Sequence, residues 1–283
     1  MIKSEIKKWA QKLKRDPNGY KYDYGHILVL AGSKQMPGAG VLSCGAALRT
    51  GAGLVTFAVK EDFLQSAISL SKPETIFFVY KNSADILEYV LARKVSACVI
   101  GPGLELNAET KRLIENIISQ LALPVVLDAS GISVFKNDFS IFKKAKSKLI
   151  LTPHEGEFSN LIGIKIAQLS KNAKTIACDF SRENNLILVL KRHKTIAASP
   201  NSLYINDTGT PAMATAGSGD VLSGIIAAFV APKNIADKDL FEAVKFAVWT
   251  HGLTGDFAQK EKGNGVIASD LIENIPNVLK KKF

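Results

Sequence analysis

Short apolar runs alternate with helical patterns through the first half of the chain. The run His26–Ala31 is continuously apolar, and the stretch of small residues Gly38–Thr50 follows it with helical spacing. Continuous apolar runs of this length are typical of parallel strands, which are buried on both faces. Further strands are predicted at Leu54–Val59, Thr75–Tyr80, Val95–Gly101, Pro124–Asp128 and Lys148–Thr152, with helices at Asp85–Arg93 and Ala108–Leu121. The alternation predicts an α/β fold with three layers, in which helices cover both faces of a mostly parallel central sheet.

The order of the patterns changes after Thr152. Helices are predicted at Glu155–Ile162, Ile166–Arg182, Gly219–Val230, Asp239–Gln259 and Ala268–Lys280, and short strands at Leu186–Leu190, Thr195–Ala198 and Leu203–Ile205. The opening segment places Ile2, Ile6, Trp9 and Leu13 on one face of a helix, which would dock on its own domain or on a neighbouring subunit. No repeat or linker is visible, so a single domain spanning residues 1–283 is expected.

Composition and charge exclude several classes of protein. No segment holds the roughly 18 apolar residues of a membrane-spanning helix, and the charged N-terminus is unlike a signal peptide. Cys44, Cys98 and Cys178 are far apart, which indicates neither a disulfide framework nor a zinc site. The net charge is +10, but the lysines are dispersed and lack interleaved aromatic residues. We therefore expect a cytoplasmic protein that binds neither nucleic acid nor membrane and whose positive potential suits polyanionic small molecules.

One stretch, Asn206–Phe229, combines features of an anion-binding site. Small residues and one carboxylate, Thr215–Asp220, stand directly before an apolar helical pattern, so Asp220 is predicted at a helix start. Glycines allow backbone N–H groups to converge on an anion, which the positive end of the helix dipole also favours. The same pattern would also arise if Asp220 were only a helix cap after a glycine-rich turn. As a site, it suits phosphoryl transfer with Asp220 as the general base toward a hydroxyl.

Further candidates follow the predicted strands, where ligands bind in parallel sheets. Asp128 is either a helix-capping acceptor or a contact to metal or substrate, and His154 is either a cap or a ligand contact. Glu155 and Glu157 are expected at a helix start for dipole reasons, although they could also coordinate Mg²⁺ through water. His26, His251 and Trp249 are interpreted as structural residues.

The common nucleotide and hydrolase motifs are missing from the sequence. No glycine cluster matches GxxxxGK[ST] or GxGxxG, and Gly217-Ser218-Gly219 does not have the spacing of the GxSxG nucleophile elbow. A phosphate-transfer site built from the turn before Asp220 remains.

The combination of GHILVLAGSKQMPGAG, AALRTGAGLVTFAV, IGPGL, VVLDA, LTPHEGEF and TGTPAMATAGSGDVLSGIIAAF resembles the ADP/ATP-dependent NAD(P)H-hydrate dehydratases of the ribokinase-like superfamily. The similarity extends from about Gly25 to the end of the chain. It implies an enzyme that repairs the S-form of hydrated NADH or NADPH. In such enzymes ADP or ATP, with Mg²⁺, phosphorylates the hydroxyl at C6 of the damaged ring, and loss of phosphate restores the cofactor.

The resemblance also implies roles for individual residues. Asp220 matches the catalytic aspartate and a substrate contact, while Gly217 and Gly219 match the anion hole for the transferred phosphoryl group. Gly40, Gly103 and His154 match positions that contact the hydrate. The positions that contact the nucleotide are Lys191, Arg192, His193, Lys194, Thr195 and Gly219. The metal ligands are not identified. ADP is the favoured donor and a homotetramer is expected by analogy. No epimerase domain is expected before the dehydratase motifs, so any epimerisation would need a separate polypeptide.

The sequence departs from the family pattern at several positions. The family commonly has alanine at Gly40 and KGxxT where this chain has Lys191–Thr195. In the central block Thr210, Ala212 and Ala216 are substitutions, and the two alanines add methyl groups where positive φ or close ligand approach could be needed. The departures concern nucleotide affinity more than chemistry, because Asp220 and its glycines are intact.

Two other functions compete with the dehydratase. A ribokinase-like kinase for a vitamin precursor, of the hydroxyethylthiazole or pyridoxal type, would share the turn at Asp220 but gives no reason for TPHEGEF. A nucleotide-sensing protein with a decayed site would bind without turnover, against which the intact Asp220 argues.

Overall fold

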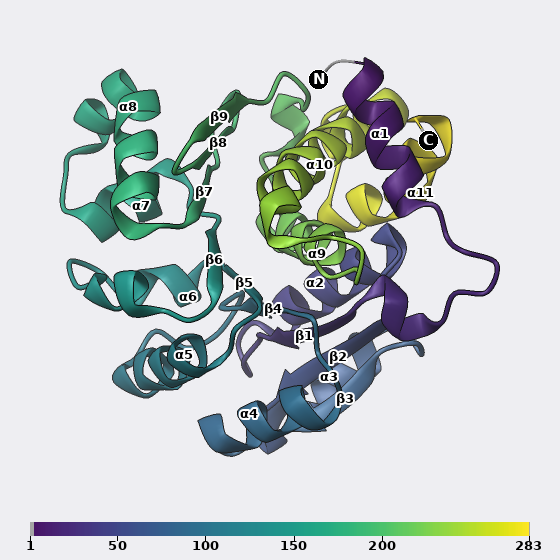
Figure 1. Ribbon diagram of the computed structural model, residues 1–283, viewed down its shortest axis with the longest axis vertical. Coiled ribbons are helices and arrows are strands. Elements are labelled where there is room, and N and C mark those ends of the chain that lie inside the picture. The colour runs from purple at the N-terminus through teal and green to yellow at the C-terminus, as the bar shows by residue number, and fades with distance from the viewer. Residues whose placement is uncertain (1–2, 283) are drawn as a thin grey trace.

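The protein, described here as a computed structural model over residues 3–282, is built on one nine-stranded sheet (Figure 1). The strand order is β3-β2-β1-β4-β5-β6-β7-β8-β9. The strands are β1 (His26–Leu30), β2 (Leu54–Val59), β3 (Ile76–Val79), β4 (Ala97–Ile100), β5 (Pro124–Leu127), β6 (Lys148–Leu151), β7 (Ile187–Leu190), β8 (Ile196–Ser199) and β9 (Ser202–Ile205). Strands β1 to β7 are parallel, and β8 and β9 close one edge as an antiparallel hairpin. The mostly parallel sheet predicted from the sequence is confirmed.

Helices cover both faces of the sheet. The helices are α1 (Lys3–Leu13), α2 (Pro37–Thr50), α3 (Leu64–Leu70), α4 (Ser83–Ala92), α5 (Ala108–Gln120), α6 (Ser130–Ser133), α7 (Glu155–Ile162), α8 (Ile166–Asn184), α9 (Ser218–Val230), α10 (Leu240–Lys262) and α11 (Ala268–Lys282). One face carries α1 to α3 and α9 to α11, and the other carries α4 to α8 (Figure 1).

Alternate residues of each strand enter two separate hydrophobic cores. In β1, Ile27 and Val29 belong to the core that includes residues of α2 and α9, whereas Leu28 and Leu30 belong to the core that includes residues of α4 and α5. This alternation follows from the period of two in a strand, and it explains why the strands read as unbroken apolar runs.

The opening helix α1 docks on its own domain. Trp9 is 3% exposed, and its ring stacks on Phe246 of α10 at a centroid distance of 5.9 Å. Ile6 and Leu13 also pack against this core, while Ile2 lies outside the described residues. Within residues 3–282, no helix combines the length and the apolar character needed to cross a membrane.

Candidate active site

Backbone hydrogen bonds join the strand exits at the carboxyl edge of the sheet into one row. The Gly32 amide after β1 donates to the Pro102 carbonyl after β4 at 2.7 Å. The Thr152 amide donates to Leu127 at 3.0 Å, and the Lys191 amide donates to Pro153 at 2.8 Å. The predicted loops therefore lie along a single edge, as expected for a parallel sheet.

Two glycines let these loops approach one another closely. Gly101 has φ +124°, and a Cβ there would lie 2.0 Å from the Asp128 carbonyl oxygen. Gly103 has φ +68°, and its Cβ would lie 2.9 Å from the Met36 carbonyl oxygen in the loop before α2. Any larger residue would separate the loops after β1, β4 and β5.

The turn before α9 leaves backbone amides available for an anion. Gly217 has φ +87° and precedes the first helical residue, and no side chain caps the turn. The first helical hydrogen bond runs from the Val221 amide to the Gly217 carbonyl at 3.0 Å. The amides of Gly219 and Asp220 come before it, at the positive end of the helix dipole. The prediction that Asp220 lies in the first turn of a helix is confirmed.

His251 of α10 holds this turn in place. Its Nε2 donates to the Ser218 carbonyl at 2.9 Å, and burial lowers the pKa of the ring to about 4, so the imidazole is neutral. The structural interpretation of His251 is therefore confirmed, although the residue acts directly beside Asp220. His26 is also structural, because its ring nitrogens lie 2.9 Å from the Arg93 carbonyl and 2.9 Å from the Thr56 hydroxyl.

A buried ion pair lies beneath the turn. Asp128, at the end of β5, accepts a hydrogen bond from the Lys191 ammonium at 2.8 Å and from the Ser223 hydroxyl at 2.7 Å. Burial opposes the charge of Asp128, but Lys191 outweighs it and holds the pKa of the carboxyl below its usual value. Burial likewise opposes the charge of Lys191, but Asp128 and Glu157 raise its pKa. Asp128 therefore acts chiefly as the partner of a lysine.

The environment of Asp220 suits a general base near neutral pH. Burial, reinforced by the negative charge of Asp128, raises the pKa of the Asp220 carboxyl from 3.8 to about 7, although Lys191 opposes this shift. A carboxylate with this pKa is a stronger proton acceptor than an exposed aspartate and is half ionised at physiological pH.

His154 caps the helix that follows β6. Its Nδ1 accepts hydrogen bonds from the amides of Gly156 at 3.0 Å and Glu157 at 3.2 Å, while Glu157 accepts from the His154 amide at 2.9 Å. Because Nδ1 accepts, the neutral ring carries its proton on Nε2, which can donate to a ligand. The backbone of His154 also forms an isolated parallel β-bridge with the backbone of Lys191. The helix cap at His154 therefore lies next to the buried ion pair.

Five of the six predicted nucleotide residues, Lys191–Thr195, form the turn between β7 and β8. Lys191 points inward to Asp128, and the Arg192 side chain pairs with Glu155 at 3.4 Å. Lys194 adopts φ +58°, and the Thr195 hydroxyl donates to the Arg192 carbonyl at 3.3 Å, which closes the turn. His193 is exposed in the same turn.

The packing of the hydrophobic core leaves no room for a side chain at Gly40. A Cβ at Gly40 would lie 2.1 Å from Cζ of Phe57, which fills the space below α2. Ala212 and Ala216 do not have positive φ, so their methyl groups cause no backbone strain of the kind anticipated from the sequence.

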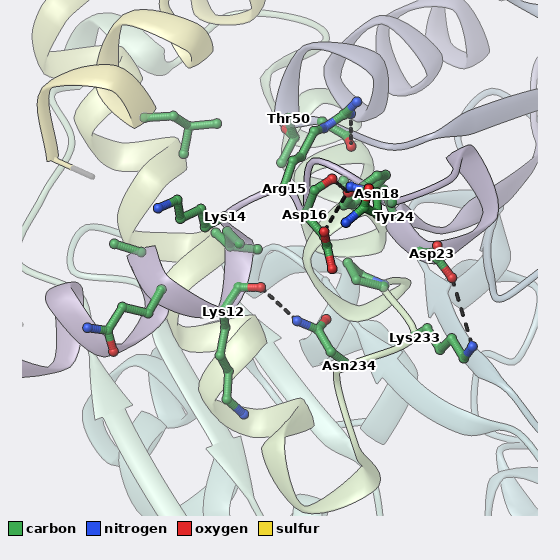
Figure 2. A pocket seen from close by; sticks show the side chains of 18 residues that line it. Lys12, Lys14, Arg15, Asp16, Asn18, Asp23, Tyr24, Thr50, Lys233 and Asn234 are labelled. Atoms are coloured by element: carbon green, nitrogen blue, oxygen red, sulfur yellow. Dashed lines mark hydrogen bonds and ion pairs between the residues drawn. The ribbon is translucent and has the colours of Figure 1, made fainter.

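The larger of two described cavities lies away from Asp220, among the segments that lead into β1 and β2 (Figure 2). It measures about 1070 Å³, and the C-terminal ends of α1, α2 and α9 meet there. Arg15 donates to the Gly51 carbonyl at 2.9 Å, and Asn234 donates to the Lys12 carbonyl at 2.7 Å. These polar groups serve helix ends, as cationic and amide side chains commonly do there.

A mostly parallel sheet, a glycine turn with uncapped backbone amides and an aspartate at a helix start are typical of a ribokinase-like protein. The family model described as NAD(P)H-hydrate dehydratase matches residues 27–277, and the chain belongs to this family.

Known proteins show the same relationship. The chain is 36% identical to a bifunctional NAD(P)H-hydrate repair enzyme of Moorella thermoacetica, over 96% of this chain and 52% of that protein. It is 32% identical to an ADP-dependent (S)-NAD(P)H-hydrate dehydratase of Neisseria meningitidis, over 91% and 86%. The crystal structure of the Bacillus subtilis ADP/ATP-dependent NAD(P)H-hydrate dehydratase, co-crystallised with ATP/Mg²⁺, matches with a TM-score of 0.83, 28% identity and 100% and 98% coverage. The chain spans about half the length of its bifunctional relatives.

Proposed function

We propose that this chain is an ADP/ATP-dependent dehydratase that restores NADH or NADPH from the S-form of its hydrate. The observation that carries the proposal is Asp220, a carboxyl with its pKa near 7 at the open N-terminus of α9. The names of the Neisseria and Bacillus relatives supply the substrate class and the nucleotide.

In the first step Asp220 takes the proton of the hydroxyl at C6 of the hydrated ring. The hydroxyl oxygen then forms a bond to the terminal phosphorus of the donor, and the bond from that phosphorus to the leaving oxygen breaks. ADP gives AMP, and ATP gives ADP. The amides around Gly217 and Gly219 hold the negative oxygens of the phosphoryl group in transfer, because preorganised N–H donors stabilise charge there without reorganisation.

In the second step the ring loses the new phosphate. The bond between C6 and oxygen breaks, inorganic phosphate leaves with the bonding electron pair, and the neighbouring ring carbon loses a proton to water as the double bond re-forms. Gly40, Gly103 and His154 are proposed to position the hydrate, with Nε2 of His154 as the donor. The nucleotide is proposed to contact Lys191, Arg192, His193, Lys194 and Thr195, together with Gly219.

The proposed Mg²⁺ fits a site supplied mainly by the donor. Residues 3–282 contain no cluster of three or more metal-ligating side chains. Asp128 is engaged by Lys191, Glu157 by the His154 amide, and Glu155 by Ser170. Phosphate oxygens and waters would hold the ion, which is a common arrangement for Mg²⁺ beside nucleotides. When bound, it neutralises phosphate charge.

The proposal also covers the location, domain organisation, nucleotide preference, assembly and partners of the enzyme. We place the enzyme in the cytoplasm as one dehydratase domain over residues 1–283, with ADP preferred over ATP and a homotetramer as the assembly. Its partners are hydrated NADH or NADPH and an adenine nucleotide.

The test is the recovery of the near-ultraviolet absorbance of the dihydronicotinamide ring. Purified protein is added to hydrated NADH or NADPH with Mg²⁺ and either ADP, ATP or no nucleotide. Recovery only with a nucleotide, and its loss in Asp220→Asn, supports the proposal and identifies the donor. Consumption of ATP with hydroxyethylthiazole or a pyridoxal precursor, without recovery of absorbance, would replace it with a vitamin kinase. Nucleotide binding without any turnover would indicate a sensor.

A further inference from the structure

Asp128 is held from three directions at the end of β5. It is 1% exposed, and its Oδ1 accepts from the Lys191 ammonium at 2.8 Å and from the Ala129 amide at 3.0 Å. Its Oδ2 accepts from Ser223, one turn after Asp220 on α9, at 2.7 Å. The carboxylate thus joins β5, β7 and α9 and has little freedom to move.

The partner ammonium lies directly under the catalytic turn. A Cβ on Gly219 would lie 2.9 Å from Nζ of Lys191 and 3.7 Å from Oδ2 of Asp128. The amine therefore occupies the space that any side chain at position 219 would need. It therefore lies close to Gly219 in the first turn of α9, where no side chain caps the backbone amides.

A cation is unfavourable at the positive end of a helix unless anions surround it. The charges of Asp128 and Glu157 both favour the ammonium form of Lys191, but only Asp128 accepts one of its three protons, which leaves donors for a bound anion. A transferred phosphoryl group at the start of α9 would be that anion.

We propose that Asp128 is a positioning residue, which fixes the Lys191 ammonium under the first turn of α9 so that ammonium and backbone amides together hold the transferred phosphoryl group. The inference rests on the phosphoryl transfer proposed above. It assigns to Asp128 an action through Lys191, and it makes Gly219 a residue that leaves room for the amine.

The arrangement also couples Asp128 to Asp220. The charged groups that face Asp220 are Asp128 after β5, Lys191 after β7 and Glu157 on α7, while His251 on α10 is neutral. Asp128 and Glu157 disfavour a negative Asp220, and Lys191 favours it. Removing the charge of Asp128 therefore leaves Lys191 unbalanced, so Asp220 should ionise at a lower pH.

The test is a ¹³C NMR titration of the Asp220 carboxyl in nucleotide-free protein, assigned by comparison with Asp220→Asn. Asp128→Asn is expected to lower the titration midpoint by about 1 pH unit or more, because an unopposed cation acts at short range. Asp128→Asn combined with Lys191→Met removes both charges, so its midpoint should return toward the native value. The double variant also avoids a buried unpaired lysine, which protects the test against loss of the fold.

The matched control is Asp138→Asn, the same change in the exposed ion pair with Lys111. It should leave the Asp220 midpoint unchanged. Calorimetric titration with ADP adds a second readout: Asp128→Asn should weaken ADP binding by about tenfold or more, the loss of one charge-assisted hydrogen bond, and Asp138→Asn should not.

An unchanged Asp220 midpoint in Asp128→Asn, or unchanged ADP affinity, overturns the inference even if the native enzyme is active. If both measurements change while the native protein fails to restore any hydrate, the role of Asp128 stands and the proposed dehydration fails. The two proposals are therefore separable.

Discussion

Replacing Asp220 by asparagine should separate the cost of burying its charge from its role in the reaction. The pKa of Asp220 is raised from 3.8 to about 7, chiefly by burial. A carboxyl with a raised pKa costs nothing below pH 3.8, and its cost grows as the pH rises toward the folded pKa. The shift of about 3 pH units corresponds to about 4 kcal/mol in the free energy of unfolding at pH 8 and about 2 kcal/mol at pH 5.

Asparagine is uncharged in both states, so Asp220→Asn should be more stable than the native protein by these amounts while losing turnover. For a chain of this size about 4 kcal/mol raises the melting temperature by about 8 °C, and the gain at pH 5 should be about half of that. Thermal unfolding followed by circular dichroism at pH 5 and pH 8 measures both values. A melting temperature at pH 8 that does not rise, or a gain that is equal at both pH values, would refute the reasoning.

The control variant, Asp138→Asn, should change the melting temperature in the opposite direction. The exposed Asp138 has its pKa lowered by a hydrogen bond from Lys111 and by the charge of that lysine. A lowered pKa contributes stability above the unfolded pKa, so Asp138→Asn should reduce the melting temperature slightly at pH 8. A gain there would show that removing any carboxylate stabilises this strongly charged protein.

Three further predictions follow from the same geometry. In the native enzyme kcat/KM for the hydrate should fall about tenfold per pH unit below pH about 7, since protonated Asp220 accepts no proton. Gly219→Ala should lower kcat at least about tenfold, because its Cβ displaces the Lys191 amine, whereas a normal kcat would contradict the position of that amine. Trp9→Ala should cost about 3–5 kcal/mol in chemical denaturation, because it empties a buried site against Phe246, and a cost below about 1 kcal/mol would show that α1 is not docked.

The central strands could be predicted because a strand that is buried on both faces consists of a continuous run of apolar residues. Each predicted strand is present, and the boundaries differ by at most two residues: the prediction Thr75–Tyr80 corresponds to β3, which runs from Ile76 to Val79. The helices α3 and α6 were not predicted. Both helices are too short to produce the periodicity that identifies a helix in a sequence. In addition, α6 begins after Ala129, whose φ of +49° cannot be predicted from an alanine in the sequence.

The candidate site could be predicted only where its residues are adjacent in the sequence. Gly217, Gly219 and Asp220 are adjacent in sequence, so a glycine-rich turn followed by a helix is visible directly. The pair of Asp128 and Lys191 joins positions 63 residues apart, and neither carries a local signal for the other. An aspartate at the end of an apolar strand and a lysine at the end of another were the available clues. Only the order of strands places both under α9.

The departures from the family pattern acquire a physical interpretation from these contacts. Arg192 replaces the family's glycine without positive φ, and its guanidinium pairs with Glu155 at the start of α7. The nucleotide turn is therefore tied to the helix that His154 caps. Since His154 is a proposed contact to the hydrate, Arg192 links the two proposed binding loops at their base. The substitution thus adds an ion pair between the two loops, while the Lys191 ion pair beside the proposed phosphoryl site needs no glycine at position 192.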